Sequence, residues 1–221
     1  PEKRDLMISI ESSPVVFGNR AYWTNSGGMV VGIDWTRVKN QEAEIVFTYW
    51  TGDDTDATPV IDERGHLYVA VEKELDNGRG SQAAAKRVES EGQLIKLDPM
   101  NPSNPVLWKV AIPARGKNDD GGIWSTPALD LKRGSVIVTT HPGELLAVDR
   151  DTGKELWRKN LGHHEWSSPV VIGDDLLVGR CMKVGLELFD LTTGLEPKST
   201  WATQIPRGCV ESTPAVWKGR I

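Results

Sequence analysis

The sequence predicts an all-β protein made of repeated four-stranded antiparallel blades, and three observations support this prediction. A Ser/Thr-Pro pair followed by apolar residues occurs five times, at Pro14, Pro59, Pro127, Pro169 and Pro214. An apolar stretch that ends in Asp follows each of the first four pairs, at Asp34, Asp98, Asp149 and Asp190. The 221 residues also include 9 Trp, but only 3 Phe and 3 Tyr. Two landmarks in a fixed order over four units indicate an internal repeat.

Each repeat contains four short apolar segments separated by turns. Three of the four intervals between the prolines are 42–45 residues long, and the second unit is longer because of an insertion at residues 72–91. Four strands in about 40–45 residues are typical of a β-propeller blade. We therefore expect a single, partial β-propeller domain of about four and a half blades. The predicted blades are residues 11–55, 56–122, 123–164 and 165–209, and the next blade starts at 210–221.

The third unit carries the clearest motif, because residues 147–157 read AVDRDTGKELW. This stretch resembles the A-x-D-x-x-T-G-x-x-x-W tryptophan-docking repeat of the PQQ-type (quinoprotein-like) β-propellers. That superfamily includes quinoprotein dehydrogenases and the lipoprotein scaffold of the outer-membrane barrel-assembly machine. The other units keep parts of the motif, namely Asp190, Gly194 and a displaced Trp201, Asp98 and Trp108, and Asp34 and Trp50.

The chemistry of these residues gives the motif a structural role. An Asp at the start of a turn accepts hydrogen bonds from backbone N–H groups ahead of it, and a Gly at its end can adopt a positive φ. A Trp on the outer strand can bury its ring between adjacent blades. We therefore expect structural docking roles for Asp149, Gly153, Trp157, Asp190, Gly194 and Trp108, and also for Trp50 and Trp201.

The predicted ring does not close within these repeats. Proteins that the chain resembles close with seven or eight blades, so we expect the remaining blades to come from a longer chain or from another copy. A compact ring of four or five blades is the alternative. This compact ring is disfavoured, because open blade edges invite aggregation.

Propeller topology places the loops between blades on the same face as the loops between second and third strands. In the dehydrogenases that the chain resembles, this face carries the cofactor and the substrate site. The position three residues before each repeat proline falls in these loops. The residues at this position are Glu11, Asp56, Trp124, Trp166 and Glu211. With the neighbouring loops, the predicted binding face comprises Asp56, Trp124, His141, His164, Trp166, Arg180, Arg207 and Glu211.

Each of these residues also has a structural interpretation. The acidic residues can be solvated turns, His141 can be a hydrogen-bonded loop residue, and Trp124 and Trp166 can cap blade junctions. The adjacent side chains of His163 and His164 usually diverge, so we predict no metal site there. The Asp53–Asp56 run lacks the full loop of a known calcium motif.

The two cysteines, Cys181 and Cys209, fall in two loops of the predicted binding face. A disulfide between them is geometrically plausible. It would argue for an oxidising compartment.

The predicted function is a non-catalytic binding or assembly scaffold for a protein or polymer partner on this face. The chain lacks a P-loop, G-x-S-x-G, H-E-x-x-H, Cys-x-x-Cys-His and an adjacent Cys pair. The alternative is part of a PQQ-dependent dehydrogenase that oxidises alcohols or sugars. We expect no cofactor except under that alternative, which requires PQQ with Ca²⁺.

Charge and hydropathy limit the partners further. The net charge of −5 disfavours a nucleic-acid partner, and the absence of any run of 18 apolar residues predicts no membrane span. The resemblance implies a periplasmic or extracellular location.

Overall fold

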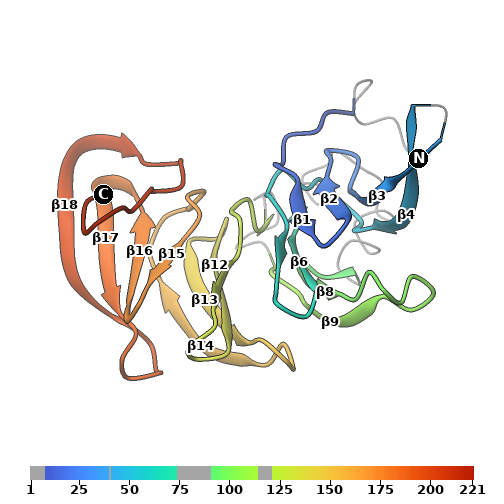
Figure 1. Ribbon diagram of the computed structural model, residues 1–221. Coiled ribbons are helices and arrows are strands. Elements are labelled where there is room, and N and C mark those ends of the chain that lie inside the picture. Colours follow the sequence, from blue (N-terminus) through green and yellow to red (C-terminus); the bar gives the residue numbers. More distant parts are fainter. Residues whose placement is uncertain (1–7, 40, 74–90, 114–120) are drawn as a thin grey trace. The chain divides into compact units, whose positions relative to one another are not determined.

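The computed structural model describes residues 8–39, 41–73, 91–113 and 121–221. The chain divides into two compact units, Pro1–Ile123 (unit 1) and Trp124–Ile221 (unit 2) (Figure 1). Each unit contains two four-stranded antiparallel sheets, and in every sheet the strands lie side by side in chain order. This is the up-and-down arrangement of a blade, as the repeat predicts.

Unit 1 contains the first two blades. The first comprises β1 (Val15–Phe17), β2 (Arg20–Thr24), β3 (Met29–Lys39) and β4 (Glu42–Trp50). The second comprises β5 (Val60–Ile61), β6 (Leu67–Ala70), β8 (Leu94–Leu97) and β9 (Val106–Val110). A separate two-stranded pair joins β7 (Glu72–Lys73) to β10 (Gly121–Gly122). Most of the predicted insertion, residues 74–90, lies outside the described residues.

Unit 2 contains the other two blades. One comprises β11 (Ala128–Asp130), β12 (Ser135–Thr140), β13 (Glu144–Asp149) and β14 (Glu155–Asn160). The other comprises β15 (Val170–Ile172), β16 (Asp175–Gly179), β17 (Cys181–Asp190) and β18 (Lys198–Cys209). β12 reads SVIVTT and is buried along its whole length, which suits its many β-branched residues. Residues 210–221, predicted to start the next blade, contain an isolated bridge between Trp217 and Arg220.

Each unit has its own apolar core, made by the strands of both its blades. In unit 1 the core includes Tyr22, Phe47, Val69 and Ile95. In unit 2 it includes Ile137, Leu145, Trp157, Leu176 and Phe189. Since both cores draw on two sheets, packing between neighbouring blades stabilises each unit.

The Asp that ends each third apolar stretch organises a turn. Asp149 Oδ1 accepts hydrogen bonds from the backbone N–H and the hydroxyl of Thr152, both at 2.7 Å. Gly153 follows with a φ of 71°. Asp190 accepts from the N–H of Thr192 at 2.7 Å, and Gly194 has a φ of 66°. These contacts match the predicted local geometry of the Asp-Thr-Gly motif.

In unit 1 and in unit 2, buried hydroxyls link a blade to the segment that follows it, and the sequence did not predict these contacts. We call this set the hydroxyl ladder, and its members are Thr24, Thr139 and Ser167. In unit 1, Thr24 Oγ1 donates to the carbonyl of Ala57 at 2.9 Å. In unit 2, Thr139 Oγ1 donates to the carbonyl of Ser167 at 2.7 Å, and Ser167 Oγ to the carbonyl of Ser212 at 3.0 Å. Each accepting carbonyl belongs to the residue two positions before a repeat proline, namely Ala57, Ser167 and Ser212.

Candidate binding site

Two tryptophans at the same repeat position come together in unit 2. Trp124 precedes β11 and Trp166 precedes β15, each three residues before the repeat proline. Their ring centroids lie 5.7 Å apart and their planes differ by 15°. Both side chains are half-buried. The repeat therefore places two indole rings side by side on one end of the blades.

Two histidines complete this group of rings, which we call the aromatic cluster (Trp124, His141, His164 and Trp166). His141, from the loop between β12 and β13, stacks on Trp124 with centroids 4.8 Å apart. His164, from the loop before β15, stacks on Trp166 at 4.7 Å. The two imidazoles lie 5.8 Å from each other. Three loops of two blades thus contribute four nearly parallel rings.

Backbone contacts fix the two histidine-bearing loops against each other. The N–H of Leu161 donates to the carbonyl of Gly143 at 2.9 Å. Gly143 has a φ of 85°, and a Cβ at this position would lie only 2.0 Å from the carbonyl oxygen of His163. Only glycine allows the loops to approach this closely in this conformation. The close approach brings His141 and His164 within stacking distance.

The indole N–H groups of Trp124 and Trp166 are buried, and neither has a hydrogen-bond partner among the described residues. A buried donor without an acceptor costs free energy, so such groups usually meet a ligand or water. The two nitrogens themselves have almost no exposed surface, so the cluster presents mainly the partly exposed faces of its rings. Such a surface suits a flat or extended ligand.

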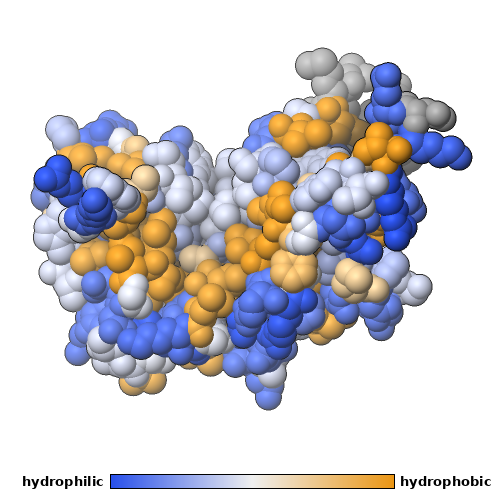
Figure 2. Space-filling model, in the orientation of Figure 1, coloured by the Kyte–Doolittle hydropathy of each residue, from blue (hydrophilic) through white to orange (hydrophobic). Residues whose placement is uncertain are grey.

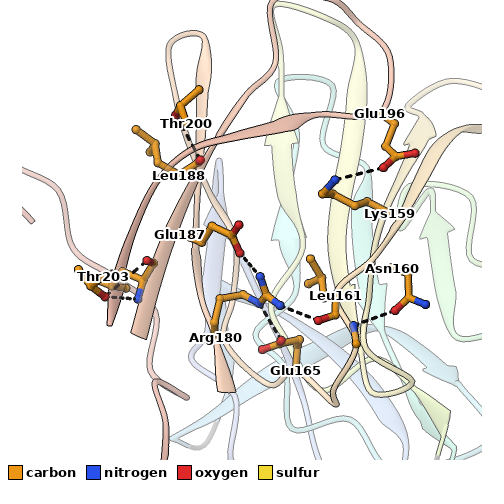
Figure 3. Close-up of polar contacts among 12 residues, drawn as sticks. Lys159, Asn160, Leu161, Glu165, Arg180, Glu187, Leu188, Glu196, Thr200 and Thr203 are labelled. Carbon is orange, nitrogen blue, oxygen red and sulfur yellow. Dashed lines mark hydrogen bonds and ion pairs between the residues drawn. The ribbon is translucent and has the colours of Figure 1, made fainter. Parts of the chain in front are cut away.

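Arg180 contacts the loop that carries His164 and is engaged inside unit 2 (Figure 3). Its Nε donates to Glu165 at 2.8 Å, its Nη2 donates to the carbonyl of Leu161 at 2.7 Å, and its Nη1 pairs with Glu187. Burial raises the pKa of Glu165, although the hydrogen bond from Arg180 acts in the opposite direction. The arginine thus ties β16 and β17 to the loop that carries His164. Its guanidinium, predicted for the binding face, is committed to internal contacts.

The other residues of the predicted face are not part of the aromatic cluster. Arg207 in β18 and Glu211 after it are exposed. Asp56 lies in unit 1, half-buried, next to Asp54, which accepts a hydrogen bond from the N–H of Thr55 at 2.7 Å. Glu11, also in unit 1, accepts a hydrogen bond from the hydroxyl of Ser9 at 2.6 Å.

The predicted docking tryptophans differ in burial. Trp157 and Trp108 are both 8% exposed. Trp157 belongs to the core between the two blades of unit 2, and Trp108 packs against the ring of Tyr68 at 5.9 Å. Trp50 is half-buried, whereas Trp201 is 45% exposed. The displaced tryptophan, Trp201, is thus the most exposed of the four.

Cys181 and Cys209 form a disulfide. The two residues are directly opposite each other at the ends of β17 and β18. The structure therefore contains the bond that the sequence made plausible.

Apolar side chains also reach the surface of both units on the face drawn in Figure 2. The exposed large apolar residues include Phe17, Val38 and Ile45 in unit 1 and Leu195, Trp201 and Trp217 in unit 2. They lie in β1, β3, β4 and β18 and in the segments that follow β17 and β18.

PQQ with Ca²⁺, the cofactor of the dehydrogenase alternative, would need cations and carboxylates near the aromatic cluster. A quinone that carries several carboxylates requires cations, but the Arg180 guanidinium is already paired with Glu165 and Glu187. Across the described residues, no group of three or more carboxylates has its oxygens close enough to hold Ca²⁺. The described residues therefore do not fit this cofactor, and we derive no chemistry from it.

Comparison with known proteins places this architecture in a family. The family model described as "Outer membrane protein assembly factor BamB" matches residues 90–204, more than half of the 221 residues. The chain belongs to this PQQ-repeat family. A search of curated proteins finds no match to the chain.

Solved structures that resemble this BamB-family chain are β-propellers, which confirms the predicted fold class. BamB from Moraxella catarrhalis superposes with a TM-score of 0.64 at 16% identity, over 93% of this chain and 53% of its own length. The quinohemoprotein alcohol dehydrogenase ADHIIG from Pseudomonas putida HK5 gives 0.62 at 16% identity, over 90% and 34%. Sqt1 from Saccharomyces cerevisiae gives 0.61 at 12% identity, over 86% and 45%. The chain thus spans between about a third and about half of these proteins.

No helix within the described residues has both the length and the apolar character needed to cross a bilayer.

Proposed function

We propose that the chain belongs to a non-catalytic propeller scaffold that binds a protein partner through the loops of unit 2. The aromatic cluster carries this proposal. It combines four stacked rings with partial exposure to solvent. An extended segment of a partner protein would pack its side chains on these rings, and a small movement of the two indoles would let their buried N–H groups donate to its backbone carbonyls. The family description, an assembly factor, agrees with a scaffold.

The rigidity of the surrounding blades supports the same proposal. The Arg180 contacts and the Leu161–Gly143 hydrogen bond fix the cluster loops before any partner arrives. Preorganised loops lose less conformational entropy on binding. We also propose a location outside the cytoplasm, since the Cys181–Cys209 disulfide is typical of oxidising compartments.

Site-specific photo-crosslinking in the source organism tests the proposal. A photoreactive residue at His163, exposed beside the cluster, should crosslink to one protein species. A matched probe at Lys154, exposed at the other end of β14, should not. The double substitution Trp124→Ala and Trp166→Ala should abolish the crosslink from position 163 while the chain remains folded.

Two results would contradict the proposal. Equal crosslinks from positions 154 and 163, or a crosslink unaffected by the loss of both tryptophans, would show that the cluster is not the contact. Dye-linked alcohol oxidation by the purified protein with added PQQ and Ca²⁺ would favour the dehydrogenase alternative instead.

A further inference from the structure

We propose that His164, Cys181 and Cys209 form a redox-dependent metal site that takes a zinc-type cation once the disulfide is reduced. One imidazole nitrogen of His164 and the two sulfurs all lie within 4.8 Å of one another. In the described part of the chain, no other group of three such ligands is this close. The proposal goes beyond partner binding and does not depend on it.

The donor set is the one that Zn²⁺ prefers. Two thiolates and one imidazole supply three tetrahedral positions, and the fourth stays open to water. In the disulfide state the sulfurs are not thiolates, and only the thiolate is an effective metal ligand. The oxidation state of the cysteine pair therefore decides whether the site exists.

The conversion balances with a dithiol as reductant. The dithiol supplies two electrons and two protons and becomes a disulfide itself, while the Cys181–Cys209 bond breaks and two thiols form. Zn²⁺ then displaces the two thiol protons, and two Zn–S bonds and one Zn–N bond form.

The surrounding strands keep the ligands close in both states. β17 and β18 hold the two cysteines opposite each other, so the sulfurs need only side-chain rotation to reach about 3.8 Å, the separation expected for tetrahedral Zn–S bonds of about 2.3 Å. His164 is exposed and lies in a loop, which lets its ring turn towards the sulfurs. The metal would thus replace one crosslink between β17 and β18 with another.

The buried charge of Arg180 does not oppose a divalent cation. Arg180 immediately precedes Cys181, but Glu165 and Glu187 neutralise its guanidinium. The site is also coupled to the aromatic cluster, because the same His164 ring stacks on Trp166 at 4.7 Å. A metal bound through His164 would change the surroundings of the Trp166 ring, so binding should change the fluorescence of the tryptophan.

Metal titration of the full chain tests the proposal, with Co²⁺ as the spectroscopic probe and Zn²⁺ as the competitor. After reduction with a dithiol and its removal under anaerobic conditions, the protein should bind one equivalent of Co²⁺ and show a thiolate-to-metal charge-transfer band. Zn²⁺ should abolish this band. The disulfide form should show no band and no fluorescence change.

Substitutions separate the site from adventitious binding. His164→Ala, Cys181→Ser and Cys209→Ser should each weaken the affinity of the reduced chain by at least about 10-fold, the loss typical of even an outer-shell partner. His163→Ala is the matched control and should bind like the parent, since His163 is the exposed neighbour outside the group.

Three results would overturn the proposal. The disulfide form could bind Co²⁺ as tightly as the reduced form, or His163→Ala and His164→Ala could have equal effects. The third is a reduced chain whose β-sheet circular dichroism signal is lost and does not return on addition of Zn²⁺, because no preformed site would then exist.

Discussion

The same pair of loops is built differently in the two units of the molecule. In unit 1, the loop after β2 meets the loop after β4, and the N–H of Thr51 donates to the carbonyl of Gly28 at 2.8 Å. In unit 2, the loop after β12 meets the loop after β14 through the equivalent bond from Leu161 to Gly143 at 2.9 Å. Both glycines have positive φ, 74° and 85°. The backbone frame is thus repeated closely.

The side chains on this frame differ in kind. In unit 1, hydroxyls close the loops, since Thr51 Oγ1 and Thr55 Oγ1 donate to the carbonyls of Gly28 and Asn25, both at 2.8 Å. In unit 2, stacked Trp and His rings occupy the corresponding loops. Backbone contacts and buried hydroxyls thus hold the blades together, while the exposed ends of the loops are available for recognition. Changes to the frame should therefore cost stability equally in both units.

Removing a tryptophan predicted to have a docking role should have the largest effect. Trp108→Ala in unit 1 and Trp157→Ala in unit 2 should each lower the free energy of unfolding by about 3–5 kcal/mol, because both rings are 8% exposed and their loss leaves a cavity. Urea denaturation followed by circular dichroism measures this effect. Trp201→Ala is the control, and its 45% exposed ring should cost less than about 1 kcal/mol. A large loss of stability from only one of these two substitutions would show that the two units do not depend equally on their tryptophans.

Replacing the loop glycines tests whether both units need the same close approach. A Cβ at Gly28 would lie 2.5 Å from the carbonyl oxygen of Asp53, and at Gly143 it would lie 2.0 Å from that of His163. Gly28→Ala and Gly143→Ala should each destabilise by about 2–4 kcal/mol, from left-handed strain and overpacking together.

The matched controls for these glycines are Gly18→Ala and Gly134→Ala. Both positions have positive φ, 59° and 63°, but a Cβ there meets nothing within 4 Å. Each should cost only the strain, about 1 kcal/mol. Thermal melts of the four variants measure the ranking. If the controls lose as much stability as the loop variants, the close approach is not what requires glycine.

The hydroxyl ladder should contribute similarly in both units. Thr24→Val and Thr139→Val keep the side-chain shape but remove a buried hydroxyl that donates to a carbonyl of the next blade. Each should cost about 1–2 kcal/mol, because the carbonyl loses its donor. Thr200→Val removes an exposed hydroxyl with a 3.2 Å contact, so it should change stability by less than about 0.5 kcal/mol. Amide hydrogen exchange, followed separately in the two units, would show whether only one unit loses stability.

Local motifs made much of this structure predictable from the sequence. Asp149, Thr152 and Gly153 stand within five residues, so their turn depends on little else. The repeat also predicted that Trp124 and Trp166 occupy equivalent loops, and the structure stacks them with His141 and His164. For the two tryptophans, the only other requirement is the order of strands in a blade, which places the equivalent loops at the same end.

Contacts across blades were not predictable in the same way. Thr139 meets Ser167 at a separation of 28 residues, and the Ser/Thr-Pro landmark gives no sign of that pairing. Arg180 was expected to face a ligand, whereas Glu165 and Glu187 bind its guanidinium inside the unit. β3 also continues past Asp34 to Lys39, because β4 is long enough to pair with it through Val38 and Ala43. Each outcome depends on a partner that no local pattern identifies.

The smallest effect concerns the charge of the motif aspartate and has a defined pH dependence. Hydrogen bonds from the hydroxyl and the N–H of Thr152 lower the pKa of Asp149. The folded state therefore binds this proton less readily than the unfolded state, whose Asp pKa is about 3.9. The stabilisation by the carboxylate is complete above that value and disappears as the pH falls through the lower folded pKa.

Asp149→Asn should cost less than about 1 kcal/mol at pH 7, and parent and variant should converge in acid when urea denaturation is repeated across the pH range. Asp98→Asn in unit 1 is the comparison at neutral pH and should cost less, because Asp98 accepts from the N–H of Met100 without the added threonine hydroxyl. A constant difference between parent and Asp149→Asn at every pH would show that the turn depends on the shape of the side chain rather than on its charge.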